Sequence, residues 1–292
     1  MPTPTLTTCY RKHREMYIPQ IPLDPAGPDP LNTAAQLMSR IRQKSVEMLA
    51  LRAGQRVLDL DCGAGIDTIR LAHLVGRTGE VHGTDYDAAM VVQAKARAQA
   101  NGVDAWVSHH HANATALPWP AGYFDASRSE GVFQHLLNPE RAFDEQVRVT
   151  KPGGQLVVID TDWATLTIDS DETDLERRLA QFHATHMLNN PFSGRHLRRM
   201  FANRGMPDCQ IDVEPVFMTD VALARQFMGL DRIAAEAQAA GVIDAEESRR
   251  WESSLNRAAV TGGFFAATNA VMVTGQKPAR LSAANGRHEH EY

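Results

Sequence analysis

Short apolar runs alternate with mixed polar and apolar segments along the middle of the chain, from about residue 55 to residue 162. The apolar runs predict five strands, at 56–61, 80–85, 105–110, 123–130 and 155–161. The mixed segments predict the helices between them, at about 67–74, 87–101 and 138–149. A turn is expected at 151–154, where the sequence is KPGG. Strands that alternate with helices in this way predict a parallel, doubly wound sheet.

The pattern changes on both sides of this region. Five prolines between residues 18 and 30 predict an extended connector, and a helix is expected from about residue 32 to residue 50. After residue 162, helical stretches alternate with two further predicted strands, at 171–205 (helical), 210–218 (strand), 220–259 (helical) and 269–275 (strand). The fold class expected is α/β, a doubly wound, mostly parallel seven-stranded sheet with helical cap insertions.

Composition and charge narrow the classes of function. A chain of 292 residues with 43% hydrophobic content can bury a large core, and a net charge of −5 gives no basic surface for nucleic acid. The apolar runs are too short for a membrane span, and the first 17 residues lack the apolar region of a signal peptide. Cys9, Cys62 and Cys209 have neither a disulfide nor a zinc spacing, so we expect a cytoplasmic location.

The segment VLDLDCGAG contains the glycine turn that follows the first predicted strand. Gly63 and Gly65 allow a close backbone approach at the carboxyl end of that strand, where open α/β sheets bind ligands. A dinucleotide would need a third glycine where Asp67 stands, and its pyrophosphate would be repelled by Asp59 and Asp61. Those carboxylates suit a ligand with ammonium and sulfonium charge, such as S-adenosylmethionine (SAM), whose own carboxylate could use the helix N-terminus.

A second acidic position supports a nucleoside ligand. Asp85 ends the second predicted strand, twenty positions after Gly65, where a carboxylate can accept hydrogen bonds from both ribose hydroxyls. Tyr86 beside it is expected to pack on the adenine ring. A solvated aspartate at a strand end is the structural alternative, but the turn and Asp85 in this order favour a nucleoside-type ligand.

Four motifs in order resemble class I SAM-dependent methyltransferases, in particular the ubiquinone/menaquinone-biosynthesis-like branch of small-molecule methyltransferases. VLDLDCGAG resembles the glycine motif and GTDYDAAM the ribose motif. ANATALPWPAGYFDA resembles the segment that meets adenine, and FQHLLNPERAFDEQVRVTKPGGQLVVID resembles the following helix, turn and fifth strand. The resemblance covers roughly residues 40–162. The sequence departs from the family at Asp61, where a small residue is usual, and at Asn113, where Asp is usual.

The resemblance implies roles for the residues of these motifs in binding SAM. Asp59, Gly63 and Gly65 would line the methionine end of SAM, Asp85 would hold the ribose, Asn113 and Ala114 would meet the adenine edge, and the backbone near Ser129 and Glu130 would face the methionine amine. Tyr17 is expected to close over the cofactor. The chain is expected to have four parts: an N-terminal arm and helix over the cofactor site at 1–40, a SAM-binding core at 41–162, a sheet completion with a helical substrate cap at 163–277 and, because it has few apolar residues, a disordered tail at 278–292.

The candidate catalytic residues lie where the substrate pocket of such a fold opens. Methyl transfer needs an aligned nucleophile, and a base helps when that nucleophile is a hydroxyl. His135 follows the fourth strand, and Asp160 and Asp162 follow the fifth; each is a candidate base. The structural interpretation stays open for all three, as a histidine bonded to backbone and as caps or solvated acids. Trp163 is interpreted as a pocket wall, or alternatively as core.

Five other histidines and two phenylalanines need an interpretation. His183 and His186, three apart, are expected to share a helix face and to roof the substrate pocket, and no metal site is expected from them. The run 109–111, all histidine, is interpreted as a strand end. Phe264 and Phe265 are interpreted as core.

The function expected is transfer of a methyl group from SAM to an O, N or C atom of a small, biosynthetic acceptor, which leaves S-adenosylhomocysteine. The alternative is a SAM-binding protein that does not methylate, such as a cyclase or a regulatory binder. A nicotinamide-dependent oxidoreductase is disfavoured by the missing third glycine. The partner expected is the small-molecule acceptor, with neither nucleic acid nor a membrane. The alanine-rich segment 220–240 is either a homodimer face or packing within the cap.

Overall fold

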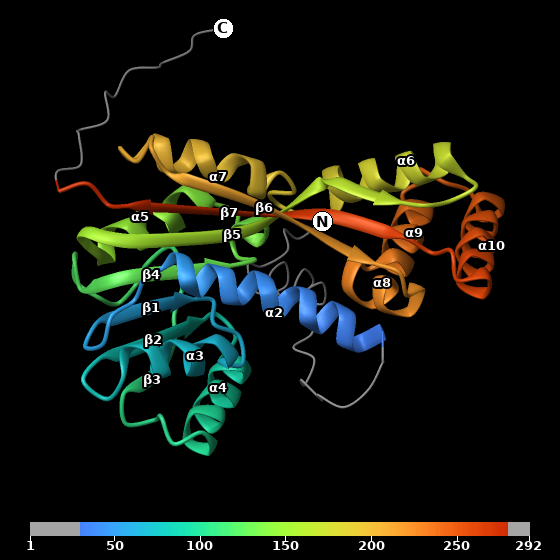
Figure 1. Ribbon diagram of the computed structural model, residues 1–292. Helices are drawn as coiled ribbons and strands as arrows, with labels where there is room; N and C mark the ends of the chain where they lie inside the picture. The colour runs from blue at the N-terminus through green and yellow to red at the C-terminus, as the bar shows by residue number, and fades with distance from the viewer. Residues whose placement is uncertain (1–29, 280–292) are drawn as a thin grey trace, which may run out of the picture.

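The computed structural model describes residues 30–279, and within them the strands form one seven-stranded sheet (Figure 1). The strands are β1 (Arg56–Leu60), β2 (Glu80–Asp85), β3 (Val107–His111), β4 (Phe124–Glu130), β5 (Thr150–Ile168), β6 (Gln210–Met218) and β7 (Ala266–Gln276). Their order is β3-β2-β1-β4-β5-β7-β6. β1 to β5 pair in parallel, whereas β7 is antiparallel to both β5 and β6. The predicted doubly wound, mostly parallel sheet is confirmed.

Helices cover both faces of this sheet, and each face has its own apolar core. One core includes side chains from α2 (Pro30–Met48), α3 (Ile66–Val75) and α4 (Ala88–Ala100). The other packs α5 (Pro139–Val149) and α7 (Ser193–Ala202) on the sheet. Successive residues of β5 alternate between the two cores, which explains its unbroken apolar run LVVI: both sides of a central parallel strand are buried.

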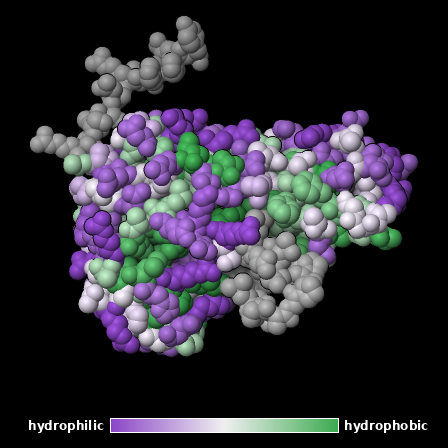
Figure 2. Space-filling view, in the orientation of Figure 1, coloured by the Kyte–Doolittle hydropathy of each residue, from purple (hydrophilic) through white to green (hydrophobic). Residues whose placement is uncertain are grey.

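The remaining helices gather around the far ends of the long strands β5, β6 and β7 (Figure 1). They are α6 (Thr173–Phe182), the π-helix η2 (His183–Met187), α8 (Val221–Met228), α9 (Leu230–Ala239) and α10 (Ala245–Thr261). We call α6, η2, α8, α9 and α10 the cap. Hydrophilic residues are spread over the outside of the cap, and hydrophobic ones occupy smaller areas of the same face of the molecule (Figure 2). The apolar faces of the cap helices are therefore turned inward.

Several predicted boundaries differ from the observed ones, and two of the differences have a clear physical reason. The first helix begins at Pro30 rather than near residue 32, and proline suits a first turn because its missing N–H has no partner there. β5 was predicted to end at 161 after a turn at 151–154, but it runs from Thr150 to Ile168. The KPGG segment is a bulge within the strand, since Phe124 pairs with Thr150 and Ala126 with Gln155.

Some expectations concern residues outside the described range, among them Tyr17 and the tail from residue 280 onward. The expected boundaries at 40/41 and 162/163 fall inside α2 and β5, so both elements continue across them. No helix between residues 30 and 279 is both long and apolar enough to cross a membrane.

Candidate functional site

The glycine turn bends the chain sharply from β1 into α3. Its backbone is left-handed at Asp61 (φ 63°), Gly63 (φ 55°) and Gly65 (φ 76°). A Cβ at Gly65 would lie 2.9 Å from the Cβ of Ala94 and 3.0 Å from Nε2 of His109. The missing side chain at Gly65 thus lets α4 and β3 pack directly beneath the turn, and the close approach of a ligand stays a prediction.

His109 supports the turn from β3. It is 3% exposed, and its Nε2 lies 3.0 Å from the hydroxyl of Thr68 in the first turn of α3. Burial, aided by the charges of His110 and Lys95, lowers the pKa of His109 to about 4, so the ring is neutral at pH 7. The run of three histidines does end a strand, as predicted, but its first member is an interior support.

The left-handed backbone at Asp61 explains one departure from the family pattern. Side chains are strained there, and aspartate tolerates this conformation better than most residues. Replacing Asp61 with glycine should raise the free energy of unfolding by about 0.5–1 kcal/mol, measured by urea denaturation. Asp61→Ala is the control and should lower it. A loss of stability in Asp61→Gly would contradict this account and show that the carboxylate contributes more than the strain costs.

Asp85 fixes the turn to the end of β2. Its side chain is 1% exposed; Oδ2 accepts a hydrogen bond from the N–H of Gly63 (3.0 Å) and Oδ1 one from the N–H of Asp87 (2.6 Å). Tyr86 follows at the sheet edge, with its ring 5.9 Å from that of His111. The carboxylate predicted to hold the ribose is therefore placed at the carboxyl edge of the sheet, beside the glycine turn.

The adenine segment lies next to Asp85, since the N–H of Ala112 donates to the carbonyl of Asp85. Asn113 is exposed, and its Oδ1 accepts from both the N–H and the hydroxyl of Thr115, each at 2.9 Å. Ala114 is half-buried against two apolar clusters. The structure thus places Asp85, Tyr86, Asn113 and Ala114 together along the ends of β2 and β3.

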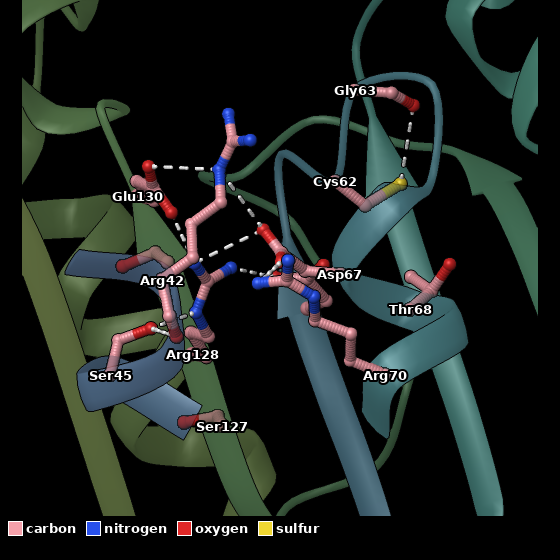
Figure 3. Close-up of polar contacts among 12 residues, drawn as sticks. Arg42, Ser45, Cys62, Gly63, Asp67, Thr68, Arg70, Ser127, Arg128 and Glu130 are labelled. Carbon is pink, nitrogen blue, oxygen red and sulfur yellow. Dashed lines mark hydrogen bonds and ion pairs between the residues drawn. The ribbon is translucent and has the colours of Figure 1, made fainter. Parts of the chain in front are cut away.

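A buried ion network occupies the other end of the glycine turn (Figure 3). Arg128 of β4 is 2% exposed and lies 3.0 Å from Asp59 and 3.3 Å from Asp67; it also pairs with Glu130. Arg42 of α2 approaches Asp67 and Glu130, each at 3.7 Å. Two arginines from α2 and β4 thus converge on carboxylates from β1, α3 and β4.

The charge of Arg128 is maintained by its neighbours. Burial opposes the charge, but Asp67, Glu130 and Asp59 together raise the pKa of the guanidinium above its ordinary value. The network was not predicted from the sequence. An arginine in the middle of a buried strand was the available signal, because a charge is buried only when it is paired.

Ser129 lies between the two charged residues of β4 and faces the other way. Its side chain is fully buried and donates to Oε1 of Gln146 on α5, at 3.3 Å. Only its backbone is near the ion network, which is the part that the resemblance assigned to the methionine amine. Oδ2 of Asp59 is buried and accepts no hydrogen bond from any residue that the structure describes.

A pocket opens beside the ion network, and we call it the edge pocket. Its lining comes from α2, the end of β4, the short helix that follows β4, the middle of β5, the end of β6, the beginning of β7, and α8. The polar lining residues are Arg42, Glu130, Gln134, Asp160, Thr161 and Thr268. The larger apolar ones are Ile41, Ile159, Trp163, Met218, Phe227 and Met228. The edge pocket therefore lies between the glycine-turn side of the sheet and the cap.

Asp160 lines the edge pocket and is 1% exposed. Its Oδ2 accepts from the N–H of Gln134 (3.0 Å) and from the hydroxyl of Ser193 (2.7 Å), while Oδ1 is buried without a hydrogen-bond partner among residues 30–279. Burial raises the pKa of Asp160 to about 7, although the hydrogen bonds from Ser193 and Gln134 oppose this. Asp160 thus combines a structural contact with a pKa near neutrality.

The other two candidate bases do not line the edge pocket. Asp162 points the same way as Asp160, as predicted, and its Oδ2 lies 2.6 Å from Nε of Arg195. His135 is half-buried in the short helix η1 (Phe133–His135), and its carbonyl accepts from the amide of Asn189. Both are therefore held by residues outside the pocket lining.

Trp163 lines the edge pocket, but the shared face predicted for His183 and His186 was wrong. His183 is fully buried with its ring 4.8 Å from that of Trp163, whereas His186 is exposed and stacks on Phe182. The segment is a π-helix, whose wider turn separates residues three apart. Burial, with a smaller effect of Arg232, lowers the pKa of His183 to about 4.

Phe264 and Phe265, both interpreted as core, differ in their surroundings. Phe264 is core, but Phe265 is 41% exposed and stacks on Phe217, so its interpretation as core was wrong. The reason is that the chain enters β7 next to the edge strand β6, where one face of the sheet is open. Among the residues described, no group of three or more His, Cys, Asp and Glu is arranged to hold a metal ion.

Comparison with known proteins supports the family. The family profile described as "Methyltransferase domain" matches residues 58–158. An uncharacterized 37.1 kDa protein in a transposon of Streptomyces fradiae is 33% identical over 258 residues, which cover 86% of this chain and 72% of that protein. A ubiquinone/menaquinone biosynthesis C-methyltransferase of Yersinia pestis is 37% identical over 116 residues, covering 40% of this chain. This chain spans only 46% of the length of the Yersinia enzyme.

Solved structures share the fold at lower identity. The [4+2]-cyclase SpnF is similar with a TM-score of 0.53 and 22% identity, over 88% of this chain and 86% of that one. A geranyl diphosphate C-methyltransferase from Streptomyces coelicolor, solved with S-adenosyl-L-homocysteine, has a TM-score of 0.53 and 17% identity, over 87% and 83%. These likenesses concern the arrangement of the sheet and its helices.

Proposed function

This chain belongs to the class I SAM-dependent methyltransferase family, and from that premise we propose that its methyl acceptor is a small molecule bound in the edge pocket. The chain is an enzyme whose cofactor is SAM. One observation carries the proposal: the lining of the edge pocket combines Glu130 and Gly131, at the end of β4, with the cap residues Phe227 and Met228. An acceptor there would lie between the cofactor end of the sheet and a water-excluding cap.

The residues present fit the two ends of SAM. The buried Oδ2 of Asp59, which accepts no hydrogen bond from the described residues, suits the methionine ammonium. The carboxylate of Asp85, at the end of β2, suits the ribose hydroxyls. When bound, SAM supplies a methyl group made electrophilic by the sulfonium. The chain's own residues hold the acceptor, align it and exclude water.

Asp160 is the proposed general base for an acceptor hydroxyl. Asp160 belongs to the lining of the edge pocket, unlike His135 and Asp162, while its carboxylate points toward Ser193 of α7. Its pKa of about 7 is near the working pH that favours base catalysis. Because its Oδ2 also accepts from the N–H of Gln134, Asp160 positions a second residue of the wall. Asp162, paired with Arg195, is proposed to fix the start of α7 beside the pocket.

The cofactor site is tested by calorimetry with SAM and with S-adenosylhomocysteine. Asp85→Ala should weaken both by about 2 kcal/mol, or roughly 30-fold, because it removes hydrogen bonds to a charged group. Asp85→Asn keeps one acceptor oxygen and should bind with intermediate affinity. Asp87→Ala, which removes the side chain that caps α4, is the matched control. Wild-type affinity in Asp85→Ala would remove Asp85 from the cofactor site.

Formation of S-adenosylhomocysteine separates methylation from its alternative. A methyltransferase releases one S-adenosylhomocysteine for each acceptor methylated, whereas a cyclase or regulatory binder would retain SAM unchanged. We expect product formation during incubation with candidate acceptors. Tight SAM binding without S-adenosylhomocysteine, while an acceptor is chemically rearranged, would favour the cyclase alternative.

A further inference from the structure

We propose that Asp59 holds a proton while the cofactor site is empty and releases it when SAM binds, so that the positive charge of the cofactor replaces the proton. The proposal rests on the cofactor site proposed above, in which Asp59 lies at the methionine end of SAM. Three observations support it. Asp59 is buried, it shares the counter-ion Arg128 with two other carboxylates, and one of its oxygens accepts no hydrogen bond from the described residues.

The position of Asp59 on β1 places its side chain in the interior. Asp59 lies opposite Gly83 of β2 and opposite Arg128 of β4, and it is 1% exposed. Gly83 has no side chain, so it brings no charge to Asp59 from β2. On the other side, Nη1 of Arg128 lies 3.0 Å from Oδ1 of Asp59. Because both groups are buried, their charges are stabilised by each other rather than by water.

Arg128 does not serve Asp59 alone. Its Nη2 lies 3.3 Å from Oδ2 of Asp67 and also pairs with Glu130. Asp59 is the deepest of the three carboxylates: its side chain is 2% exposed, against 10% for Asp67 and 19% for Glu130. The least hydrated carboxylate of the network therefore has to share its counter-ion with two others.

Two further arginines act on the outer carboxylates of the network. Arg42 lies 3.7 Å from both Asp67 and Glu130, and Arg70 lies 3.6 Å from Asp67 (Figure 3). The side chains of Arg42 and Arg70 are 16% and 32% exposed, so these ion pairs lie toward water. Both arginines thus approach from the side of Asp67 and Glu130, which are the more accessible members.

An ionised Asp59 is costly in this position, and a proton removes the cost. Burial, aided by the negative charges of Asp67 and Glu130, raises the pKa of Asp59 to about 7, although Arg128 opposes this. The thiol of Cys62 in the glycine turn keeps its proton, because burial raises its pKa well above the ordinary value. Oδ2 of Asp59, buried without a hydrogen-bond partner among residues 30–279, is the oxygen free to hold the proton.

The positive charge of SAM can take the place of this proton. In the proposed site the ammonium group of SAM lies near Asp59 and the backbone of Ser129 and Glu130. Direct contact is not required, because a charge about 7 Å away still changes a proton equilibrium roughly tenfold or more at the effective dielectric of a protein interior. In the exchange the carboxyl O–H bond breaks, its electron pair stays on the oxygen, and the proton passes to the buffer.

The protons exchanged are counted by calorimetry, with SAM titrated into the full chain at pH 6.5 in two buffers of different ionisation enthalpy. We expect release of about half to one proton per SAM bound, since a carboxyl with a pKa of about 7 is mostly protonated at pH 6.5. The amino group of SAM cannot be the source, because an α-amino group with a pKa near 8 is already charged there and can only take up a proton.

The affinity for SAM should follow the same exchange and rise at least about fivefold between pH 5.5 and pH 7. Binding of SAM without proton release, or with proton uptake, would overturn the proposal. Failure of SAM to bind at all would instead contradict the cofactor site on which the proposal rests.

Two variants locate the proton. Asp59→Asn has no carboxyl group to titrate, and Asp67→Asn removes a negative charge that competes for Arg128. Each should lower the release to less than half of the wild-type value, and Asp67→Asn decides the question where Asp59→Asn does not fold or bind SAM. Asp144→Asn, at a surface position with a side chain 63% exposed, is the matched control and should leave the release unchanged.

Asp160 also has a pKa of about 7, so Asp160→Asn tests a competing source of the proton. We expect Asp160→Asn to retain the release. Circular dichroism confirms folding of each variant. Wild-type release in folded Asp59→Asn and Asp67→Asn, or loss of release in folded Asp160→Asn, would overturn the proposal.

Discussion

Replacing Arg128 with methionine is expected to lower the free energy of unfolding by about 3–5 kcal/mol, measured by urea denaturation. Methionine fills much of the arginine volume, so the loss comes from charge rather than from a cavity. Asp59 would lose the guanidinium that lies 3.0 Å away, and Asp67 the one at 3.3 Å, inside a region where Arg128 is only 2% exposed. Leaving carboxylates buried without their cation is the costly step.

Two further variants test whether the loss of stability in Arg128→Met comes from the burial of the charges or simply from the removal of an arginine. Arg250→Met removes an arginine whose side chain is 46% exposed and whose ion pairs are on the surface, and it should change stability by less than about 0.5 kcal/mol. The double variant Arg128→Met with Asp59→Leu should recover part of the loss, since it removes one of the orphaned charges. A loss in Arg128→Met as small as that in Arg250→Met would show that water reaches the network.

Replacing Asp160 with asparagine is expected to lower kcat by about 10²–10⁴-fold for a hydroxyl acceptor. In the wild type the rate should rise with pH and level off above about pH 7, because Asp160, with a pKa of about 7, must lose its proton to act as base. Asp160→Asn should show no such rise. The measurement is kcat against pH, followed by S-adenosylhomocysteine release.

The raised pKa of Asp160 should also make the free energy of unfolding depend on pH. The unfolded side chain loses its proton near its ordinary value of 3.8, whereas the folded one keeps it to about 7. Stability contributed by Asp160 therefore falls as pH rises between those values, and Asp160→Asn should lack that part of the decline. Asp162→Asn is the control for kinetics, since Asp162 is paired with Arg195 and should not set the pH profile. A profile that survives in Asp160→Asn would return the role of base to His135.

The parallel core and the position of Asp85 could be predicted because local patterns determine them. Strand β2 was predicted at 80–85 and observed at Glu80–Asp85, since a short apolar run between two turns leaves little choice of boundary. Asp85 then had to lie at the carboxyl edge of the sheet, because it is the last residue of that strand. The placement of the motifs at one edge of the sheet could also be predicted, because each motif follows the end of a strand in a doubly wound fold.

The edge pocket and the ion network could not be predicted, because their parts are far apart in the sequence. Arg42, Glu130, Met218 and Phe227 come from four separate elements that only the folded sheet brings together. The length of β5 was missed for a related reason: its continuation past Asp162 depends on pairing with β7, as between Thr167 and Ala267. The π-helix at His183 likewise depends on tertiary packing against Trp163.

The long strand β5 connects the parallel sheet to the cap, so these two parts of the molecule are built on one continuous strand. A single strand of 19 residues begins beside β4, passes the pocket wall at Asp160 and ends among the cap helices at Ile168. β7 pairs with it along both halves, from Gln276 opposite Gln155 to Ala266 opposite Ile168. The cap is therefore not an independent domain. A chain that ended at residue 162 would lack β7, which pairs with the part of β5 that belongs to the parallel sheet. The proposed acceptor pocket and the proposed cofactor site are therefore connected through one strand, so we expect a substitution that displaces β5 to affect both.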